Sequence, residues 1–410
     1  MTIRRYNAET DLPHVKRIWK ECGWINDIKE DGKYIEDFYS VGDALVATME
    51  GEAECAVHSS NGSIRYDKVD LKLGAVTAVT TSHIARKQGF AKQMTAEMLA
   101  IEAEQGCAVS ALGMFDQGFY DKLGFGTGSY DQFLSFDPST LRINGHYRSP
   151  RRLTSDDFEQ VHAAMINRTR HHGGVNLDAP RLLKAELNWL DEPFGLGYFD
   201  GPGGSLSHFI WGEMKGEHGP YNISWRAYQT TTQLYELLAL IKSLGDQVHS
   251  IQMIEFGEFQ FQDLLEMPFR TRRITEDGKQ LNFSRSMAYW QLRILDLPAC
   301  ISAMHCIGPD LAFNLVITDP VTAFLQESRG WTGTDGSYIV TLGDQSSVSE
   351  GSNSHLPTLT ATINAFSRLW FGIRPANSLC ITDEMSGDPD LINALDQMIR
   401  LPIPHLGWDF

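Results

Sequence analysis

The chain has 410 residues, more than one ordinary hydrophobic core, which predicts two or three domains. Apolar residues at 42% and aromatic residues at 10% exclude a disordered chain. The net charge of −17 argues against general binding to nucleic acid or to an acidic membrane, because phosphate contacts need clustered cations. It is compatible with a cationic substrate, or simply with solubility.

Cysteine usage and the N-terminal sequence indicate a compartment. The six cysteines are scattered without a C-x-x-C pair, which favours free thiols in a reducing environment and no metal. The first residues lack the apolar segment of a signal peptide, and no stretch approaches the length of a membrane span. We therefore expect a cytoplasmic protein.

The first 81 residues predict strands and one amphipathic helix. We expect a strand at 3–6, a helix at 11–22 with apolar residues at helical spacing, and strands at 44–49 and 53–58 around a Glu50-Gly51 turn. A further strand is expected at 71–81. This strand leads directly into the first motif.

The hexad Arg86-Lys-Gln-Gly89-Phe-Ala91 lies between that strand and a helical pattern at 91–100. A strand, a turn and a helix N-terminus form an anion site, because unpaired N–H groups and the helix dipole point outward together. The hexad resembles the R/Q-x-x-G-x-G/A pattern of the GCN5-related acetyltransferases (GNAT), which implies acetyl-coenzyme A bound by this loop. The alternative is a solvated turn with two surface cations.

A second motif follows a predicted strand at 109–114. The segment Phe119-Tyr-Asp-Lys-Leu-Gly-Phe-Gly126 resembles the part of GNAT folds where a short helix ends at a glycine, here Gly124. The resemblance places Tyr120 near the acetyl-CoA sulfur. The alternative is a tyrosine that packs on the sheet edge.

The chain then repeats itself after a boundary near 136–150. Residues 151–161 match residues 5–15 in their basic residue, polar turn, acid and final valine, which predicts a duplicated domain. Strands are expected at 194–199, 206–211, 221–227 and 248–256, and a helix at 231–244. No loop motif follows the last strand, and Arg170-His-His-Gly-Gly-Val175 fits only in part, so we expect no acetyl-CoA there. The two histidines lack a third metal ligand.

The composition changes again from residue 287. We expect a strand from 290, a helix capped by Asp296, strands at 311–318, 336–343 and 356–363, and helices at 363–371 and 394–400. The Ser- and Gly-rich segment 343–355 is expected to be a mobile loop.

Together these features resemble the Eis (enhanced intracellular survival) acetyltransferases over essentially the whole chain. The resemblance implies a mixed α/β (α+β) fold: an N-terminal GNAT domain at 1–150, a degenerate GNAT-like domain at 151–287 and a sterol-carrier-like domain at 288–410. It also implies a hexamer and acetylation of small-molecule amines, including aminoglycosides, polyamines or lysine-like amines. The alternatives are a non-catalytic lipid- or CoA-binding protein and a protein N-acetyltransferase.

The resemblance also implies site residues. Tyr120 matches the family's general acid, and the free α-carboxylate of Phe410 matches its general base. The residues implied to bind acetyl-CoA are Val79, Thr81, Arg86, Lys87, Gly89 and Ala91. Position along the chain makes these residues candidates for substrate contact: Trp24, Asp27, Tyr34, Phe38 and Asp409.

Elementary acid–base chemistry constrains this mechanism. An α-carboxylate with a pKa of about 3.3–3.7 cannot readily deprotonate an ammonium with a pKa of about 10.4. Phe410 is a credible base only if burial raises its pKa, the site lowers that of the amine, or a water relays the proton. The cysteines show no base partner, so we expect direct transfer in a ternary complex without an acyl-enzyme.

Overall fold

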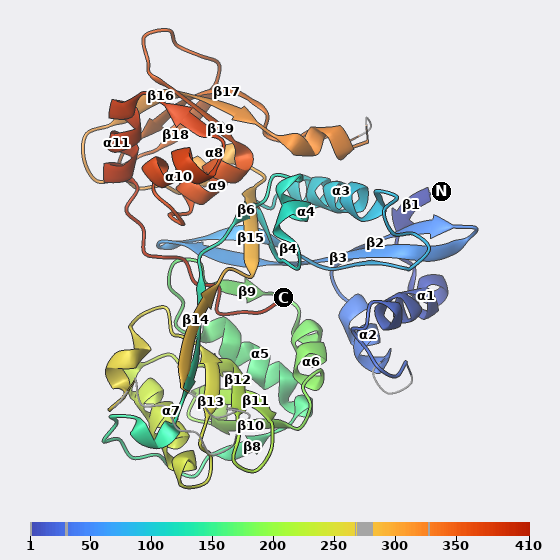
Figure 1. Cartoon of the computed structure of the whole chain (residues 1–410), viewed down its shortest axis with the longest axis vertical. Helices are drawn as coiled ribbons and strands as arrows, with labels where there is room; N and C mark the ends of the chain where they lie inside the picture. Colours follow the sequence, from blue (N-terminus) through green and yellow to red (C-terminus); the bar gives the residue numbers. More distant parts are fainter. Residues whose placement is uncertain (1, 29–31, 267, 269–281, 327–328) are drawn as a thin grey trace.

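The computed structural model describes residues 2–28, 32–266, 268, 282–326 and 329–410. Its three sheets are stacked along the long axis of the molecule, with the first sheet between the other two (Figure 1). The mixed α/β class expected from the sequence is confirmed.

The first sheet has the strand order β1-β2-β3-β4-β5-β15-β6, and β9 pairs with β3 at one edge. Its strands are β1 (Thr2–Arg5), β2 (Asp43–Met49), β3 (Glu52–Tyr66), β4 (Val69–Thr81), β5 (Val109–Gly113), β6 (Gly126–Thr127), β9 (Val175–Leu177) and β15 (Trp290–Ile294). The helices of this part are α1 (Ala8–Glu21), α2 (Gly32–Tyr39), α3 (Phe90–Glu104) and α4 (Gln117–Asp121). In Figure 1, α3 and α4 cover one face of the sheet, and α1 and α2 lie on the other.

The second sheet has the order β8-β10-β11-β12-β13-β7-β14. Its strands are β7 (Asp131–Phe136), β8 (Arg151–Leu153), β10 (Pro193–Tyr198), β11 (His208–Met214), β12 (Tyr221–Ala227), β13 (Ile251–Ile254) and β14 (Phe283–Met287), and its helices are α5 (Phe158–Asn167), α6 (Pro180–Asn188) and α7 (Thr231–Ser243).

Both sheets share one pairing pattern. Three antiparallel pairs come first, then one parallel pair (β4 with β5, or β12 with β13), then two antiparallel pairs. The matching sequence segments 5–15 and 151–161 include the start of α1 after β1 and of α5 after β8. The predicted tandem architecture is therefore present.

The two sheets exchange strands along the chain. β7 lies within the predicted first domain but pairs with β13 and β14 of the second sheet. β15 lies in the predicted third domain but pairs with β5 and β6 of the first. These long-range pairings link the three parts of the chain, and the residue limits of the domains stay a prediction.

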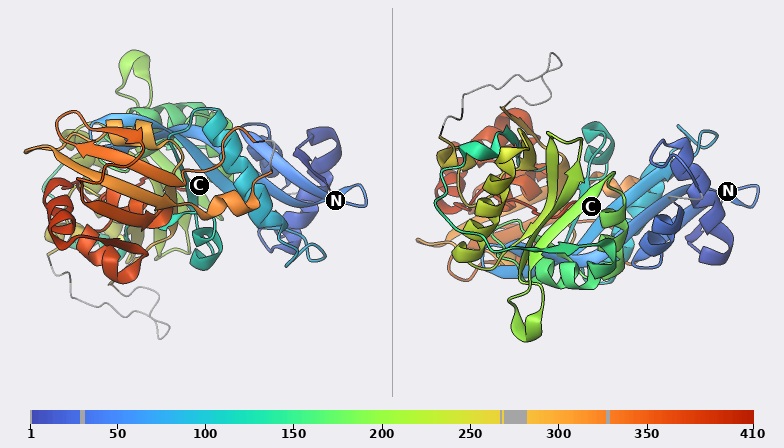
Figure 2. Two further views of the ribbon diagram at one scale, coloured as in Figure 1. Left: turned by 90° about the horizontal axis from the view of Figure 1, so that it is seen from above. Right: turned by 90° about the horizontal axis from the view of Figure 1, so that it is seen from below.

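The C-terminal part has a five-stranded sheet in the order β18-β17-β16-β19-β20, which lies over the first sheet when seen from above (Figure 2). The strands are β16 (Leu311–Thr318), β17 (Gly336–Leu342), β18 (Ser347–Glu350), β19 (Thr358–Thr362) and β20 (Met385–Gly387), and the helices are α8 (Leu297–Ser302), α9 (Ile363–Trp370), α10 (Ala376–Thr382) and α11 (Pro389–Met398). The expectation of a loop throughout 343–355 is wrong, because β18 pairs there with β17. Serine-rich sequences are compatible with an edge β-strand as well as with a loop, so the composition alone did not distinguish the two.

A buried ion pair ties this part to the first sheet. Arg293 on β15 donates to Asp319 at 2.6 Å, and both side chains are fully buried. Asp319 also accepts hydrogen bonds from the backbone of Val321 and from the backbone and hydroxyl of Thr334. These contacts fix the C-terminal sheet against β15. Across the described residues, no helix combines the length and apolarity that a bilayer crossing requires.

Candidate active site

The site begins where β4 and β5 separate. Their parallel ladder ends at the pair Val76 and Leu112, but β4 continues to Thr81. Ala78 has a φ of +50°, and the register of β4 against β3 shifts at this point. Bulges and left-handed backbone conformations at non-glycine residues are common at active sites and ligand-binding sites. Beyond Val76, the described strands leave the β5 side of β4 unpaired, so its backbone can bind an extended ligand.

The loop after β4 carries the cations of the hexad. Gly89 is the N-cap of α3 with a φ of +87°, and no side chain caps the first N–H groups of the helix. A Cβ at this position would meet nothing within 4 Å, so the glycine serves the backbone conformation. The side chains of Arg86 and Lys87 are exposed, and Ala91 in the first turn is half-buried. These groups suit the diphosphate of coenzyme A.

Tyr120 lies on α4, directly after β5. The side chain is only 2% exposed, and its ring lies 4.9 Å from Phe119 and 5.6 Å from Phe115, centroid to centroid. Burial, with the nearby Asp116 charge, raises the pKa of the phenol well above its usual value. The hydroxyl therefore keeps its proton at physiological pH and can only donate it or share it.

Phe410 ends the chain at the C-terminal end of β5. The backbone N–H of Val175 donates to the carbonyl of Leu406, which anchors the tail. A Cβ added to Gly113 would lie only 2.8 Å from a terminal oxygen of Phe410. The α-carboxylate and the helix that carries Tyr120 thus adjoin the same strand end, between the first and second sheets (Figure 1).

A cavity of about 670 Å³ opens beside this carboxylate and is lined in part by Gly113, Asp131, Asp409 and Phe410. Burial, and then the charge of Asp409, raises the pKa of Asp131 to about 7. The same two causes raise the pKa of Glu186 on α6 to about 8. Asp409 faces the solvent of the cavity but is enclosed by protein atoms, and this burial raises its pKa. Carboxyl groups with raised pKa values therefore gather around the chain end.

Sequence reasoning missed Asp131 and Glu186. Neither belongs to a motif, and both are more than 200 residues from the C-terminus in the chain. Only the folded arrangement brings them near Asp409. Asp131 begins β7, so the strand exchange between the sheets is what places it in the cavity.

The remaining candidates for substrate contact lie around α1 and α2. Phe38 is 2% exposed, with its ring 5.5 Å from Trp19 and 4.6 Å from His58, and Trp24 is 48% exposed beside Trp19. Among the five predicted substrate residues, Asp409 lines the cavity. These four do not line it: Trp24, Asp27, Tyr34 and Phe38.

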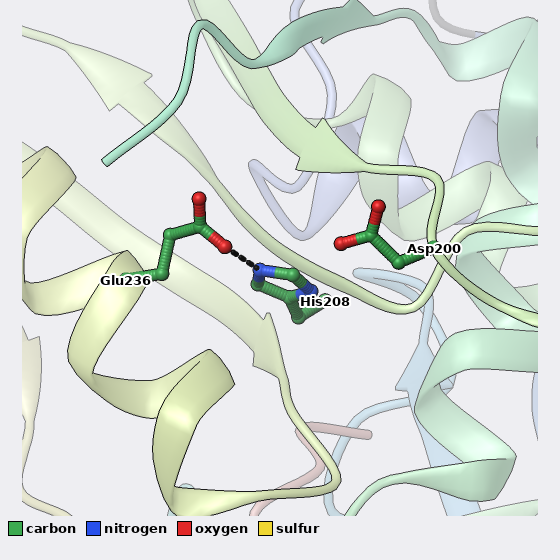
Figure 3. A group of neighbouring side chains, drawn as sticks. All are labelled: Asp200, His208 and Glu236. Carbon is green, nitrogen blue, oxygen red and sulfur yellow. Dashed lines mark hydrogen bonds and ion pairs between the residues drawn. The ribbon is translucent and has the colours of Figure 1, made fainter. Parts of the chain in front are cut away.

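A second cluster lies outside this region. The ligand atoms of Asp200, His208 and Glu236 lie within 4.8 Å of one another (Figure 3), as in a metal site. Arg148, however, contacts Asp200 at 2.5 Å and Glu236 at 2.7 Å. Hydrogen bonds from Arg148 lower the pKa of Glu236 to about 2. The guanidinium takes the place of a cation, so we interpret the cluster as an ion-pair network.

Comparison with known proteins adds a domain match and a fold. Residues 2–128 match the model of the acetyltransferase (GNAT) domain. No curated protein is detectably similar in sequence.

Several solved structures resemble the whole chain, including these three. A probable N-acyltransferase from Enterococcus faecalis is 18% identical with a TM-score of 0.79, over 100% of this chain and 99% of that one. A GCN5-related N-acetyltransferase from Anabaena variabilis is 15% identical with a TM-score of 0.79, and Eis1 from Mycobacterium abscessus is 13% identical with a TM-score of 0.75, each over 100% of both chains. At these identities the likeness establishes the fold.

Proposed function

We propose the site and the acceptor of an acetyl-CoA-dependent N-acetyltransferase. The match of residues 2–128 to the acetyltransferase (GNAT) domain supports this activity. The acceptor is a small-molecule amine of the aminoglycoside, polyamine or lysine-like kind. The acetyl group passes directly to it in a ternary complex. The observation that carries the proposal is the meeting of the chain end with the end of β5, next to the β4–β5 opening.

Acetyl-CoA binds along β4 and the following loop. Backbone groups of Val79 and Thr81 pair with the pantetheine arm, because β4 lacks a strand partner there among the described residues. The loop with Arg86, Lys87 and Gly89 binds the diphosphate, and Ala91 lies in the helix turn beneath it. Backbone N–H groups near the bulge stabilise the oxyanion of the tetrahedral intermediate.

Two groups handle the protons. The neutral amine attacks the thioester carbonyl, the C–N bond forms, and the C–S bond breaks. The carboxylate of Phe410 accepts the proton of the amine, directly or through water, and Tyr120 donates to the departing sulfur. The raised pKa of Tyr120 makes complete transfer to a thiolate, with a thiol pKa of about 8.5, uphill. Its hydroxyl acts first as a hydrogen-bond donor to the developing charge.

The carboxyls around Phe410 favour this assignment. They lie in a buried, acidic environment, which is the condition under which an α-carboxyl can have a raised pKa and act as a base. The same charges attract an ammonium and raise its pKa, so binding and activation oppose each other. Asp131 can receive the proton from Phe410 near neutral pH.

Other properties follow from the resemblance to the Eis family alone. These are a sterol-carrier-like role for 288–410 and a hexameric assembly, whereas the cytoplasmic location is proposed from the scattered cysteines. The whole-length likeness to Eis1 is a likeness of fold.

Release of free thiol from acetyl-CoA, measured with aminoglycosides, polyamines, lysine-like amines and peptides, tests the activity. The expected result is release with at least one small amine, and no release with any amine contradicts the proposal. Two residues appended after Phe410 move the carboxylate. This should lower kcat by about 100-fold or more, as loss of a positioned base does, and full activity removes Phe410 from the mechanism.

A further inference from the structure

The second sheet has the same opening as the first. The parallel ladder between β12 and β13 ends at Ile223 and Met253, but β12 continues to Ala227. Arg226 follows the last paired residue by three positions, as Val79 follows Val76 on β4. The sequence lacks a diphosphate loop here, yet the opening is hollow. The cavity beside Phe410 extends between these strands and is lined by residues of both.

One end of this cavity holds a half-buried arginine that forms no ion pair with the described residues. Arg226 donates a hydrogen bond to the backbone carbonyl of Glu255 at 3.0 Å, and its guanidinium lies 4.1 Å from the centroid of Phe256. In the described part of the chain, Arg226 forms no ion pair. Glu258 is nearby but is bound by the Tyr228 hydroxyl at 2.8 Å and by His171 at 3.0 Å. Burial lowers the pKa of Arg226, which is the electrostatic cost of a desolvated cation.

Three other arginines on the cavity wall differ from Arg226. Arg168 donates to backbone carbonyls, among them that of Gly407, and to the side chain of Asn176. Arg170 is paired with Asp70 at 2.9 Å, and Arg285 stacks on Phe133 with its guanidinium 5.0 Å from the ring centroid. Arg226 is thus half-buried and keeps free N–H donors, which are the features of an anion receptor.

The tail of the chain connects this end of the cavity to the acidic end. His405 lies against Gly257, one residue from Phe256, and Arg168 donates to the carbonyl of Gly407 at 3.1 Å. Three residues later the chain ends at the carboxylate of Phe410. An extended chain advances by about 3.3 Å per residue, so Gly407 and Phe410 are at most about 10 Å apart. Arg226 and Phe410 also line the same cavity, so a molecule within it can contact both.

We propose that the acceptor amine also carries an anionic group, a carboxylate or a phosphate-like group, which Arg226 binds while the carboxylates at the chain end hold the amine. This inference rests on the proposed function and narrows its substrate class. Lysine-like acceptors satisfy it. A polyamine does not, because its second ammonium would face the Arg226 guanidinium.

Matched acceptors test the charge directly. The ω-amino acids and the α,ω-diamines of equal length, with 4 to 10 carbons, differ at the far end only in charge. We expect kcat/KM to be about 10- to 100-fold higher for the amino acids at the best length, because a charge-assisted hydrogen bond contributes about 1.5–3 kcal/mol. The ω-aminoalkylphosphonates of the same lengths distinguish a phosphate-like ligand from a carboxylate. Equal or better use of the diamines overturns the inference.

Variants at Arg226 test whether this residue causes the preference for amino acids. Arg226→Gln should raise KM for the amino acids by about 10-fold or more, change kcat little and leave the diamines unaffected or improved. Arg226→Lys should restore part of the preference. The control is Arg152→Gln, on the exposed edge strand β8 of the same sheet. A preference for amino acids that survives in a folded Arg226→Gln protein overturns the assignment.

The affinity of the protein for acetylated products gives a further test, which requires neither turnover nor a variant. Calorimetry on the unaltered protein compares 6-acetamidohexanoate with N-acetyl-1,5-diaminopentane. Tighter binding of the acid by about 10-fold supports the inference, and equal or weaker binding overturns it. Thiol release with diamines but without preference for acids contradicts this inference alone. Absence of release with every amine contradicts the proposed function, and the binding comparison still decides the anion site.

Discussion

Adding one methyl group at Gly113 should displace the terminal carboxylate of Phe410. Gly113 ends β5, has a backbone conformation open to alanine, and approaches the terminal carboxylate. In Gly113→Ala, the added Cβ would lie 2.8 Å from a terminal oxygen of Phe410, whereas ordinary contacts begin at 3.4 Å. The carboxylate must therefore move by roughly 0.6 Å, the difference between these two distances. A misplacement of about 1 Å can cost about 100-fold in rate.

We expect kcat to fall by about 10- to 100-fold in this variant. The free energy of unfolding should change by less than about 1 kcal/mol, because alanine is compatible with the strand. Steady-state thiol release and thermal unfolding measure the two quantities. Gly118→Ala is the control, since a Cβ there meets only Asp116, at 3.6 Å. A fully active Gly113→Ala enzyme refutes a catalytic role for the carboxylate in the position that the structure gives it.

Three further predictions concern acid–base groups. Tyr120→Phe should lower kcat by about 100-fold or more with little change in KM, because only a hydroxyl is removed; unchanged kcat would exclude Tyr120 as the donor. Glu186 has its pKa raised to about 8 from 4.5, so the folded state retains a proton that the unfolded chain releases and stability falls as pH rises across this interval. Glu186→Gln should remove this pH dependence and raise the free energy of unfolding at pH 9 by about 1–3 kcal/mol, less than the full linkage because the side chain keeps some solvent contact. Denaturant titrations at pH 5 and 9 measure this free energy, and an unchanged pH dependence contradicts the prediction. Arg293→Met leaves Asp319 buried without its cation and should cost about 3–5 kcal/mol of unfolding free energy; a loss below about 1 kcal/mol would show that the backbone donors suffice.

Local patterns predicted several elements in all three sheets. β12 and β16 occupy the expected residues, and β4, α3 and α7 differ from expectation by a few residues at their ends. Apolar periodicity and turn residues determine such elements from neighbours in sequence. Asp296 caps its helix as expected, through a hydrogen bond from the N–H of Ala299. These features depend on short-range interactions.

What depends on distant residues could not be predicted. Nothing in the sequence of β7 or β15 indicates that each completes the sheet of another part of the chain. The acidic group around Asp131 depends on that exchange, and the lone Arg226 depends on which carboxylates the fold brings near it. The role of Phe410 came from family resemblance, and Gly113 became informative only through its distance to the chain end.

A crystal structure of the protein with coenzyme A tests the central claim most directly. The account predicts the diphosphate at Arg86–Gly89, the pantetheine along β4 beyond Val76, and the sulfur between the Tyr120 hydroxyl and the carboxylate of Phe410. Coenzyme A bound instead in the opening of the second sheet, or with its sulfur distant from Tyr120 and Phe410, would contradict it.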